Sequence, residues 1–141
     1  MKKIIKFILA TIFLFALLTS FGCKQNEPLV IKESDTYIVI KVSDSKMDIT
    51  ANTTLYDYMT KLKSDNLLEF ESKNGMITGI NGIQNPADWS SCWMLYTDDE
   101  EFSDTTYSID YNGKIYGSSL FGAETLTVKD GCVYIWVYQS F

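Results

Sequence analysis

The spacing of hydrophobic and polar residues along the chain predicts one helix among several strands. Residues 37–42 are mostly β-branched or aromatic, which predicts a strand. Thr54 and Asp57 have the spacing of a capping box, so a helix is expected to begin here and to end near residues 64–66. Four apolar residues recur at three- and four-residue intervals, as on one buried face of this helix: Leu55, Tyr58, Met59 and Leu62.

After the helix, strand patterns alternate with turn signals. Asn74-Gly75 and Asn112-Gly113 are typical of tight hairpins, because both residue types tolerate positive φ. The strands predicted around these turns are residues 68–73, 76–80, 92–97, 107–111, 114–117 and 132–139. We therefore expect an α+β fold in which one helix covers a mixed sheet. If the first strand pairs with the last in the centre of that sheet, the arrangement is β-grasp-like.

The last strand has two chemically different faces. Aliphatic residues alternate with aromatic ones, Val133, Ile135 and Val137 against Tyr134, Trp136 and Tyr138. We expect the aliphatic row to face the helix, which leaves the aromatic row on the other side together with Met94 and Tyr96. Such a surface predicts a stacking platform for a flat ligand or a partner, with Trp89 as a further candidate contact. Alternatively, a loop at residues 85–91 or 118–124 covers these residues as a second small core, or provides the binding site itself.

The beginning of the chain has the order of a secretory signal peptide. A lysine-rich start leads into an apolar run at residues 7–18, which is shorter than the ~20 residues of a membrane-spanning helix. Gly22 then precedes Cys23, in the position at which bacterial lipoproteins carry their lipid. We expect residues 1–22 to be a lipoprotein signal peptide and Cys23 to anchor the protein to the outer side of the bacterial cell membrane. The alternative is cleavage nearby, which would leave Cys23 as an ordinary thiol.

The composition after Cys23 predicts a tether followed by one domain. Residues 23–33 are mostly polar, as in a short tether, and residues 34–141 have the length of a single domain. Cleavage before Cys23 would leave nine of the twelve lysines and all eighteen acidic residues, a net charge of −9. This charge disfavours anionic ligands, and no nucleic acid partner is expected.

The residue types available exclude several kinds of catalytic site. The chain has no His, and all of its basic residues are lysines, so Ser–His and Cys–His pairs and imidazole metal ligands cannot form. We therefore expect no enzyme, no catalytic residue and no metal site. We interpret the acidic run at residues 98–101 as a solvated loop, because it lacks the alternation and the glycine of a calcium loop.

Cys92 and Cys132 are candidates for a disulfide, because the signal peptide predicts an oxidising compartment. Each residue begins a predicted strand. If these strands are antiparallel neighbours, the two residues lie at opposite ends, beyond the ~7 Å over which a disulfide can form. A parallel arrangement or a curled loop would permit the bond, so both outcomes stay open.

Four stretches of the chain, in this order, resemble a known family. They are residues 53–59 (TTLYDYM), 75–82 (GMITGING), 92–96 (CWMLY) and 128–131 (VKDG), which precede the aromatic last strand. Their order is similar to that in the bacterial domain of unknown function numbered 4430, which is related to the C-terminal domain of transcobalamin and intrinsic factor. The resemblance covers residues 37–141 and implies a β-grasp-like fold.

The resemblance also implies a function in binding. We expect an extracytoplasmic, lipid-anchored binding module for a cobalamin-like corrinoid or another flat ligand. The alternative is a module that binds a transport or surface protein or a glycan and takes no small molecule. No imidazole is available for the cobalt of a corrinoid, because the chain has no His.

Overall fold

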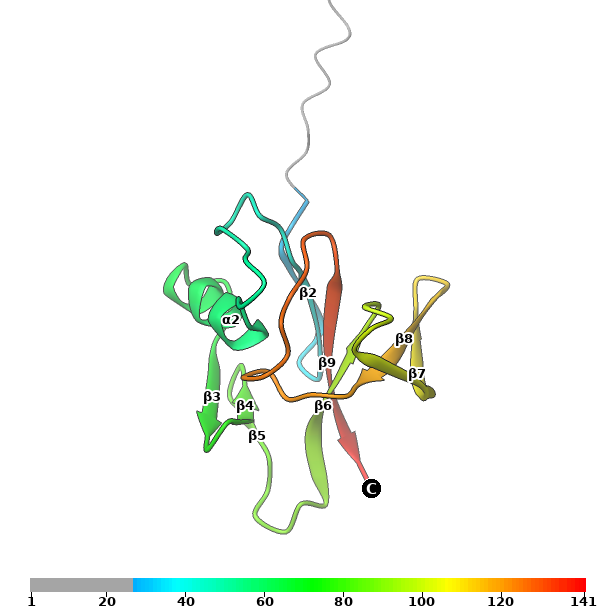
Figure 1. The fold of residues 1–141 in the computed structure, drawn as a ribbon. Coiled ribbons are helices and arrows are strands. Elements are labelled where there is room, and N and C mark those ends of the chain that lie inside the picture. Colours follow the sequence, from blue (N-terminus) through cyan, green and yellow to red (C-terminus); the bar gives the residue numbers. More distant parts are fainter. Residues whose placement is uncertain (1–26) are drawn as a thin grey trace, which may run out of the picture.

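The computed structural model describes residues 27–141, which form one helix and nine strands in two sheets (Figure 1). The helix is α2 (Leu55–Ser64). The strands are β1 (Val30–Ser34), β2 (Tyr37–Lys41), β3 (Phe70–Lys73), β4 (Met76–Ile80), β5 (Ile83–Gln84), β6 (Ser91–Thr97), β7 (Ser103–Tyr111), β8 (Lys114–Ser119) and β9 (Val133–Ser140). The α+β class is confirmed. The signal peptide and Cys23 lie outside the described residues.

The main sheet has the order β1-β2-β9-β6-β8-β7, and β3, β4 and β5 form a smaller sheet. The first strand predicted from the sequence, now β2, therefore meets the last strand near the centre, since β9 pairs with β2 on one side and with β6 on the other. The predicted mixed sheet is wrong, because the described strands pair in the antiparallel sense. The predicted tether also ends too late, because Val30–Ser34 pairs with β2 as an edge strand.

Helix α2 begins where the sequence predicts. The hydroxyl of Thr54 accepts a hydrogen bond from the Asp57 amide (3.2 Å), and the Asp57 carboxylate accepts one from the Thr54 amide (2.9 Å), so the capping box is confirmed. The predicted apolar face of the helix is fully buried. Within this face, the Tyr58 hydroxyl donates to the Lys41 carbonyl (3.2 Å), which ties the helix to the end of β2.

The predicted orientation of the last strand is wrong. Tyr134 and Trp136 share a buried cluster with the helix, whereas Ile135 packs on the other side of the sheet with Tyr96 and Tyr116. The register explains the grouping, because residues directly opposite one another share a face, and Trp136 lies opposite Leu95 while Ile135 lies opposite Tyr96. Both faces are buried, so the alternation itself could not indicate which row the helix covers.

Candidate ligand-binding cleft

An open cleft of about 320 Å³ lies on the helix side of the main sheet. Trp93 and Leu95 of β6 and Trp136 of β9 form its floor. One wall is the β3–β4 turn and the start of β4, at residues 75–77, and the other is residues 118–123, at the end of β8 and beyond. The cleft thus lies between the two sheets of the protein.

The floor and the mouth of the cleft are both apolar but differ in exposure. The floor residues Trp93, Leu95 and Trp136 are at most 8% exposed. By contrast, Met76, Leu120 and Phe121 at the mouth are about half exposed. A concave, mostly apolar surface with an open mouth is typical of a ligand site.

The wall at residues 118–123 exists because β8 separates early from β6. The two strands pair only through Tyr96 and Thr97 of β6, although β6 pairs with β9 over its whole length. Beyond β8 the chain crosses to the start of the helix, where the carbonyls of Ala123 and Leu126 accept hydrogen bonds from the amides of residues 56 (2.9 Å) and 55 (2.8 Å). These amides have no partner within a helix, so the helix N-terminus fixes the position of the wall.

The side chain of Asn85 holds the two sheets together below the cleft. Its Nδ2 donates to the Ile77 carbonyl of β4 (3.2 Å), and its Oδ1 accepts from the Trp93 amide of β6 (3.0 Å). The Asn85 side chain thus links β4 of the small sheet to β6 of the main sheet. Sequence reasoning placed Asn85 in a loop and missed this role, because an Asn before Pro86 has the pattern of an ordinary turn residue.

The two tryptophans of the floor differ in their hydrogen bonding. Trp93 Nε1 donates to the Ile83 carbonyl at 2.9 Å. Trp136 Nε1 is buried and has no acceptor among the described residues. Since a buried donor without an acceptor is unfavourable, the floor of the cleft contains one unsatisfied polar group.

The structure does not bring the predicted platform residues onto one surface. Tyr134, Trp136 and Tyr138 lie on the helix side, whereas Met94 and Tyr96 pack on the opposite side. The expectation that all five share a face is therefore wrong, because it depended on the inverted orientation of β9.

The predicted platform residues have separate structural environments. Tyr134 is fully buried, and Tyr138 packs against the Trp93 ring with centroids 5.4 Å apart. Met94 borders the cleft from within β6, but its side chain belongs to the opposite cluster. Trp89 is half exposed on the loop before β6 and is not among the residues that line the cleft. Of the predicted ligand contacts, Trp136 is therefore the one whose side chain belongs to the floor.

Cys92 and Cys132 carry free thiols. Cys92 lies opposite Gln139 at one end of the β6–β9 pair, and Cys132 directly precedes β9 at the other end. This is the antiparallel arrangement for which the sequence predicts no bond. Burial raises the pKa of both thiols, which makes them less reactive near neutral pH.

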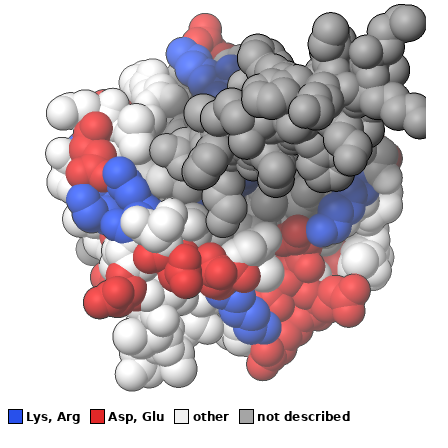
Figure 2. All heavy atoms as spheres, turned by 90° about the horizontal axis from the view of Figure 1, so that it is seen from above, with Lys and Arg blue, Asp and Glu red and all other residues white. Residues whose placement is uncertain are grey.

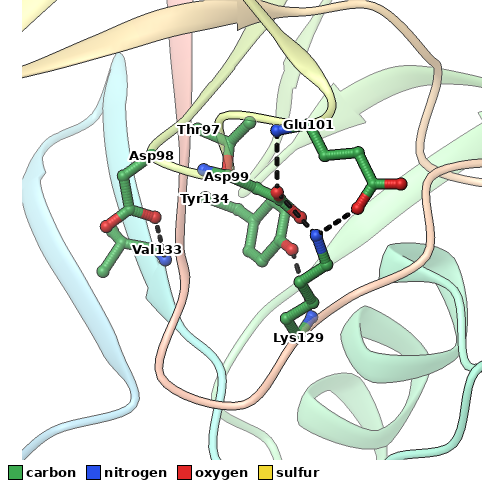
Figure 3. Close-up of polar contacts among 7 residues, drawn as sticks. All are labelled: Thr97, Asp98, Asp99, Glu101, Lys129, Val133 and Tyr134. Atoms are coloured by element: carbon green, nitrogen blue, oxygen red, sulfur yellow. Dashed lines mark hydrogen bonds and ion pairs between the residues drawn. The ribbon is translucent and has the colours of Figure 1, made fainter.

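The acidic run at residues 98–101 is partly buried and ties the β6–β7 turn to the start of β9 (Figure 3). Asp98 accepts hydrogen bonds from the Val133 amide (2.8 Å) and from Lys114 Nζ (2.6 Å). Its side chain is 9% exposed and that of Asp99 is 4% exposed. The interpretation of this run as a solvated loop is therefore wrong for its first two residues.

Lys129 completes this turn as its central cation. Its Nζ lies 2.7 Å from Glu101 and 2.9 Å from Asp99, and these two carboxylates raise the pKa of Lys129. Its backbone amide donates to the buried hydroxyl of Tyr134 (3.3 Å). In the described part of the chain, no group of three or more His, Cys, Asp or Glu residues is placed to hold a metal ion.

Acidic side chains are prominent on the surface at the end where the described chain begins (Figure 2). They gather in several groups that are bordered by lysines. Among the ion pairs of the protein, Asp65 pairs with both Lys46 and Lys61. A surface of this kind repels anionic ligands more than neutral ones. Within residues 27–141, no helix has both the length and the apolar character needed to span a membrane.

Comparison of the chain with models of known families, with curated proteins and with solved structures finds no match. The resemblance to the domain of unknown function numbered 4430 therefore stays a prediction from the sequence. The cleft and its geometry are the basis for a functional proposal.

Proposed function

We propose that the protein is a lipid-anchored, extracytoplasmic binding module and that the cleft is its ligand site. The observation that carries this proposal is an open cleft of about 320 Å³ with a buried apolar floor. Its lining contains no carboxylate, lysine or cysteine. Because the lining offers no acid, base or strong nucleophile, binding is favoured over catalysis.

The size of the cleft limits the ligand. Ligand pockets usually measure roughly 300–1,000 Å³, so this one is near the lower end of that range. A small flat molecule would fit between the walls, whereas a cobalamin-like corrinoid would insert only one edge. We therefore propose a flat, largely apolar ligand, with the edge of a corrinoid as one member of that class.

The proposed anchor would orient the cleft. Cys23 lies six residues before Leu29, a stretch that spans at most about 20 Å when fully extended. The described chain begins at the top of Figure 1, whereas the small sheet that forms one wall of the cleft lies towards the bottom. A domain anchored through Cys23 would therefore present the cleft away from the membrane.

We also propose that the fold is a variant of the β-grasp. Two features support this: the helix follows the first hairpin along the chain, and the last strand pairs with a strand of that hairpin. The antiparallel sense of the β2–β9 pair and the additional β7–β8 hairpin distinguish it from the arrangement expected of a mixed sheet.

The ligand proposal is tested by calorimetric titration of the full-length protein, held in lipid nanodiscs, with corrinoids and smaller flat aromatic molecules. We expect binding by at least one of them, and weaker binding by Phe121→Ala, which removes a side chain at the mouth of the cleft. Phe141→Ala is the matched control, because Phe141 is exposed and does not line the cleft. No binding by any compound, or equal weakening by the two variants, would contradict the proposal.

The anchor is tested separately by detergent phase partitioning of the wild type and of Cys23→Ala. We expect the wild type in the detergent phase and the variant in the aqueous phase. Equal partitioning of both proteins would remove the lipid anchor from the proposal without affecting the cleft.

A protein partner is a second candidate occupant of the cleft. The exposed side chains of Met76, Leu120 and Phe121 support it, because an apolar rim of this kind can also receive a side chain of a transport or surface protein. A photo-reactive residue placed at position 120 in cells would distinguish the two. One discrete crosslinked protein would favour the partner, whereas crosslinking to small molecules alone would favour the ligand.

A further inference from the structure

Trp93 and Trp136 form a natural pair for comparison, because they share a sheet face and a degree of burial but differ in hydrogen bonding. They lie on adjacent strands, face the same side of the sheet and are 5% and 4% exposed. The indole N–H of Trp93 donates to a carbonyl, whereas that of Trp136 has no acceptor among the described residues. Buried donors in folded proteins nearly always have a partner, so the exception at the floor of the cleft calls for a specific explanation.

We propose that the ligand of the cleft carries a neutral hydrogen-bond acceptor on an otherwise apolar, flat body, and that Trp136 Nε1–H donates to this acceptor. The inference rests on the proposed function of the cleft and adds the polar group that the ligand must have. A mostly apolar lining with a few polar groups is a common way to fix the orientation of a small ligand.

The acceptor reaches the indole by displacing part of the rim. The N–H itself is closed off from solvent, and Trp136 is one of the residues that line the cleft. Leu120 and Phe121 at the mouth are about half exposed, and exposed side chains change rotamer rapidly. A ligand that moves them aside would satisfy the donor that is unpaired in the free protein.

The charges around the cleft favour a neutral acceptor over a carboxylate. No lysine lines the cleft, so an anionic group would be buried without a counter-charge. The Glu124 side chain lies beside the wall at Gly75, where an added Cβ would be 2.8 Å from its Oε2. A ketone, amide or ether oxygen therefore suits the site better than an acid.

The test compares two flat molecules that differ mainly at one position, 9-fluorenone with its carbonyl and fluorene with a methylene group. Dissociation constants are measured for full-length protein in lipid nanodiscs, with empty nanodiscs correcting for probe dissolved in lipid. We expect fluorenone to bind about tenfold more tightly, the effect of one hydrogen bond made to an already desolvated donor. Trp136→Phe should remove this preference, and Trp93→Phe should leave it in place.

A spectroscopic measurement on the wild type decides the same question without any variant. The chain has three tryptophans and hence three indole N–H signals in a ¹H–¹⁵N spectrum. We expect the Trp136 signal to move downfield with fluorenone but not with fluorene, which controls for the ring current of the probe. Fluorene-9-carboxylate should bind more weakly than fluorenone.

The outcomes separate this inference from the proposed function. If both probes bind equally, or if the preference survives in Trp136→Phe, the hydrogen bond is refuted and the cleft remains a ligand site. If neither probe binds, the cleft is refuted as a site for flat apolar molecules, and this inference fails with it.

Discussion

The two faces of the main sheet are both buried, but they have different kinds of cover. On one side, large aromatic side chains such as Trp136 lie beneath three separate pieces of chain: α2, the small sheet and residues 118–126. On the other side the sheet curls, so that β7 and β8 lie against β2 and β9, with the Tyr37 and Tyr111 rings 5.9 Å apart. This second cover is a single hairpin.

This contrast shows where a binding site can form in a small domain. A hairpin is continuous, so its side chains cover the sheet as one layer. Separate pieces of chain are joined at particular contacts, such as the Asn85 side chain between the two sheets and the backbone hydrogen bonds between residues 123–126 and the helix, and a gap remains between the pieces. The cleft is that gap.

The largest effects are expected from truncations on adjacent positions of β9, one on each face. Trp136→Ala should lower the free energy of unfolding by about 3–5 kcal/mol, and Ile135→Ala by about 2–5 kcal/mol, because both side chains are buried. Denaturant unfolding measures both. A loss below about 0.5 kcal/mol for Ile135→Ala would show that the hairpin does not cover its face.

Removal of the bridge between the sheets should have an intermediate effect. Asn85→Ala leaves the Trp93 amide and the Ile77 carbonyl without their partner, so we expect a loss of about 2 kcal/mol in the free energy of unfolding. Asn85→Asp is the matched comparison, because it keeps the acceptor for the Trp93 amide but places a carboxylate oxygen in place of the donor to the Ile77 carbonyl, so we expect it to be no more stable than Asn85→Ala. Equal stability of Asn85→Ala and wild type would mean that packing alone holds the sheets together.

A smaller effect is expected at the start of the helix that covers the aromatic face. Thr54→Ala removes the acceptor for the Asp57 amide and should lower the free energy of unfolding by about 1 kcal/mol. Thr60→Ala, at an exposed position within the helix, should leave stability unchanged or raise it slightly. If both variants behave alike, the capping box contributes nothing measurable.

The smallest effects on the free energy of unfolding are expected from changes in pH. One face of the sheet should lose stability in acid and the other in alkali. Hydrogen bonds from Lys46 and Lys61 lower the pKa of Asp65, at the end of α2, from 3.8 to about 2. This contribution is present above pH 3.8 and is lost as the pH falls towards 2. On the other face, the hydrogen bond to Glu33 raises the pKa of Tyr111 from 10.0 to about 12. That contribution is present below pH 10 and is lost as the pH rises towards 12.

Urea midpoints measured from pH 2 to 12 test both ends of this comparison. We expect Asp65→Asn to flatten the profile only in acid and Tyr111→Phe to flatten it only in alkali. An unchanged acid limb in Asp65→Asn would mean that other carboxylates dominate the loss of stability in acid. An unchanged alkaline limb in Tyr111→Phe would mean that the Tyr111–Glu33 hydrogen bond does not contribute to the loss of stability in alkali.

Local sequence signals predict most of the elements of this fold. The capping box at Thr54 marks the first turn of α2, and Asn74-Gly75 and Asn112-Gly113 occupy the predicted hairpin turns with positive φ at all four residues. Each of these features depends on residues within a few positions of one another, so no knowledge of the tertiary structure is needed. The strand β1 escaped prediction because it is short and follows a polar segment.

The face of β9 and the cleft could not be predicted in the same way. Alternation assigns Ile135 and Trp136 to opposite faces, but which face the helix covers depends on contacts between distant parts of the chain. The cleft also requires β8 to leave β6 after two paired residues and Asn85 to reach both sheets. Two of the residues proposed from the sequence, Met94 and Trp136, line the cleft, but both were selected for their side-chain type rather than for their position.

The central position of β9 has a consequence for the biosynthesis of the protein. Residues 133–140 supply the neighbour of β2 on one side and of β6 on the other, so the main sheet is divided until they have left the ribosome. A nascent chain therefore cannot complete either hydrophobic cluster, since both contain residues of β9. A chain whose β9 has not yet emerged is therefore incompletely folded, which is the state that a polypeptide needs for threading through a narrow export channel.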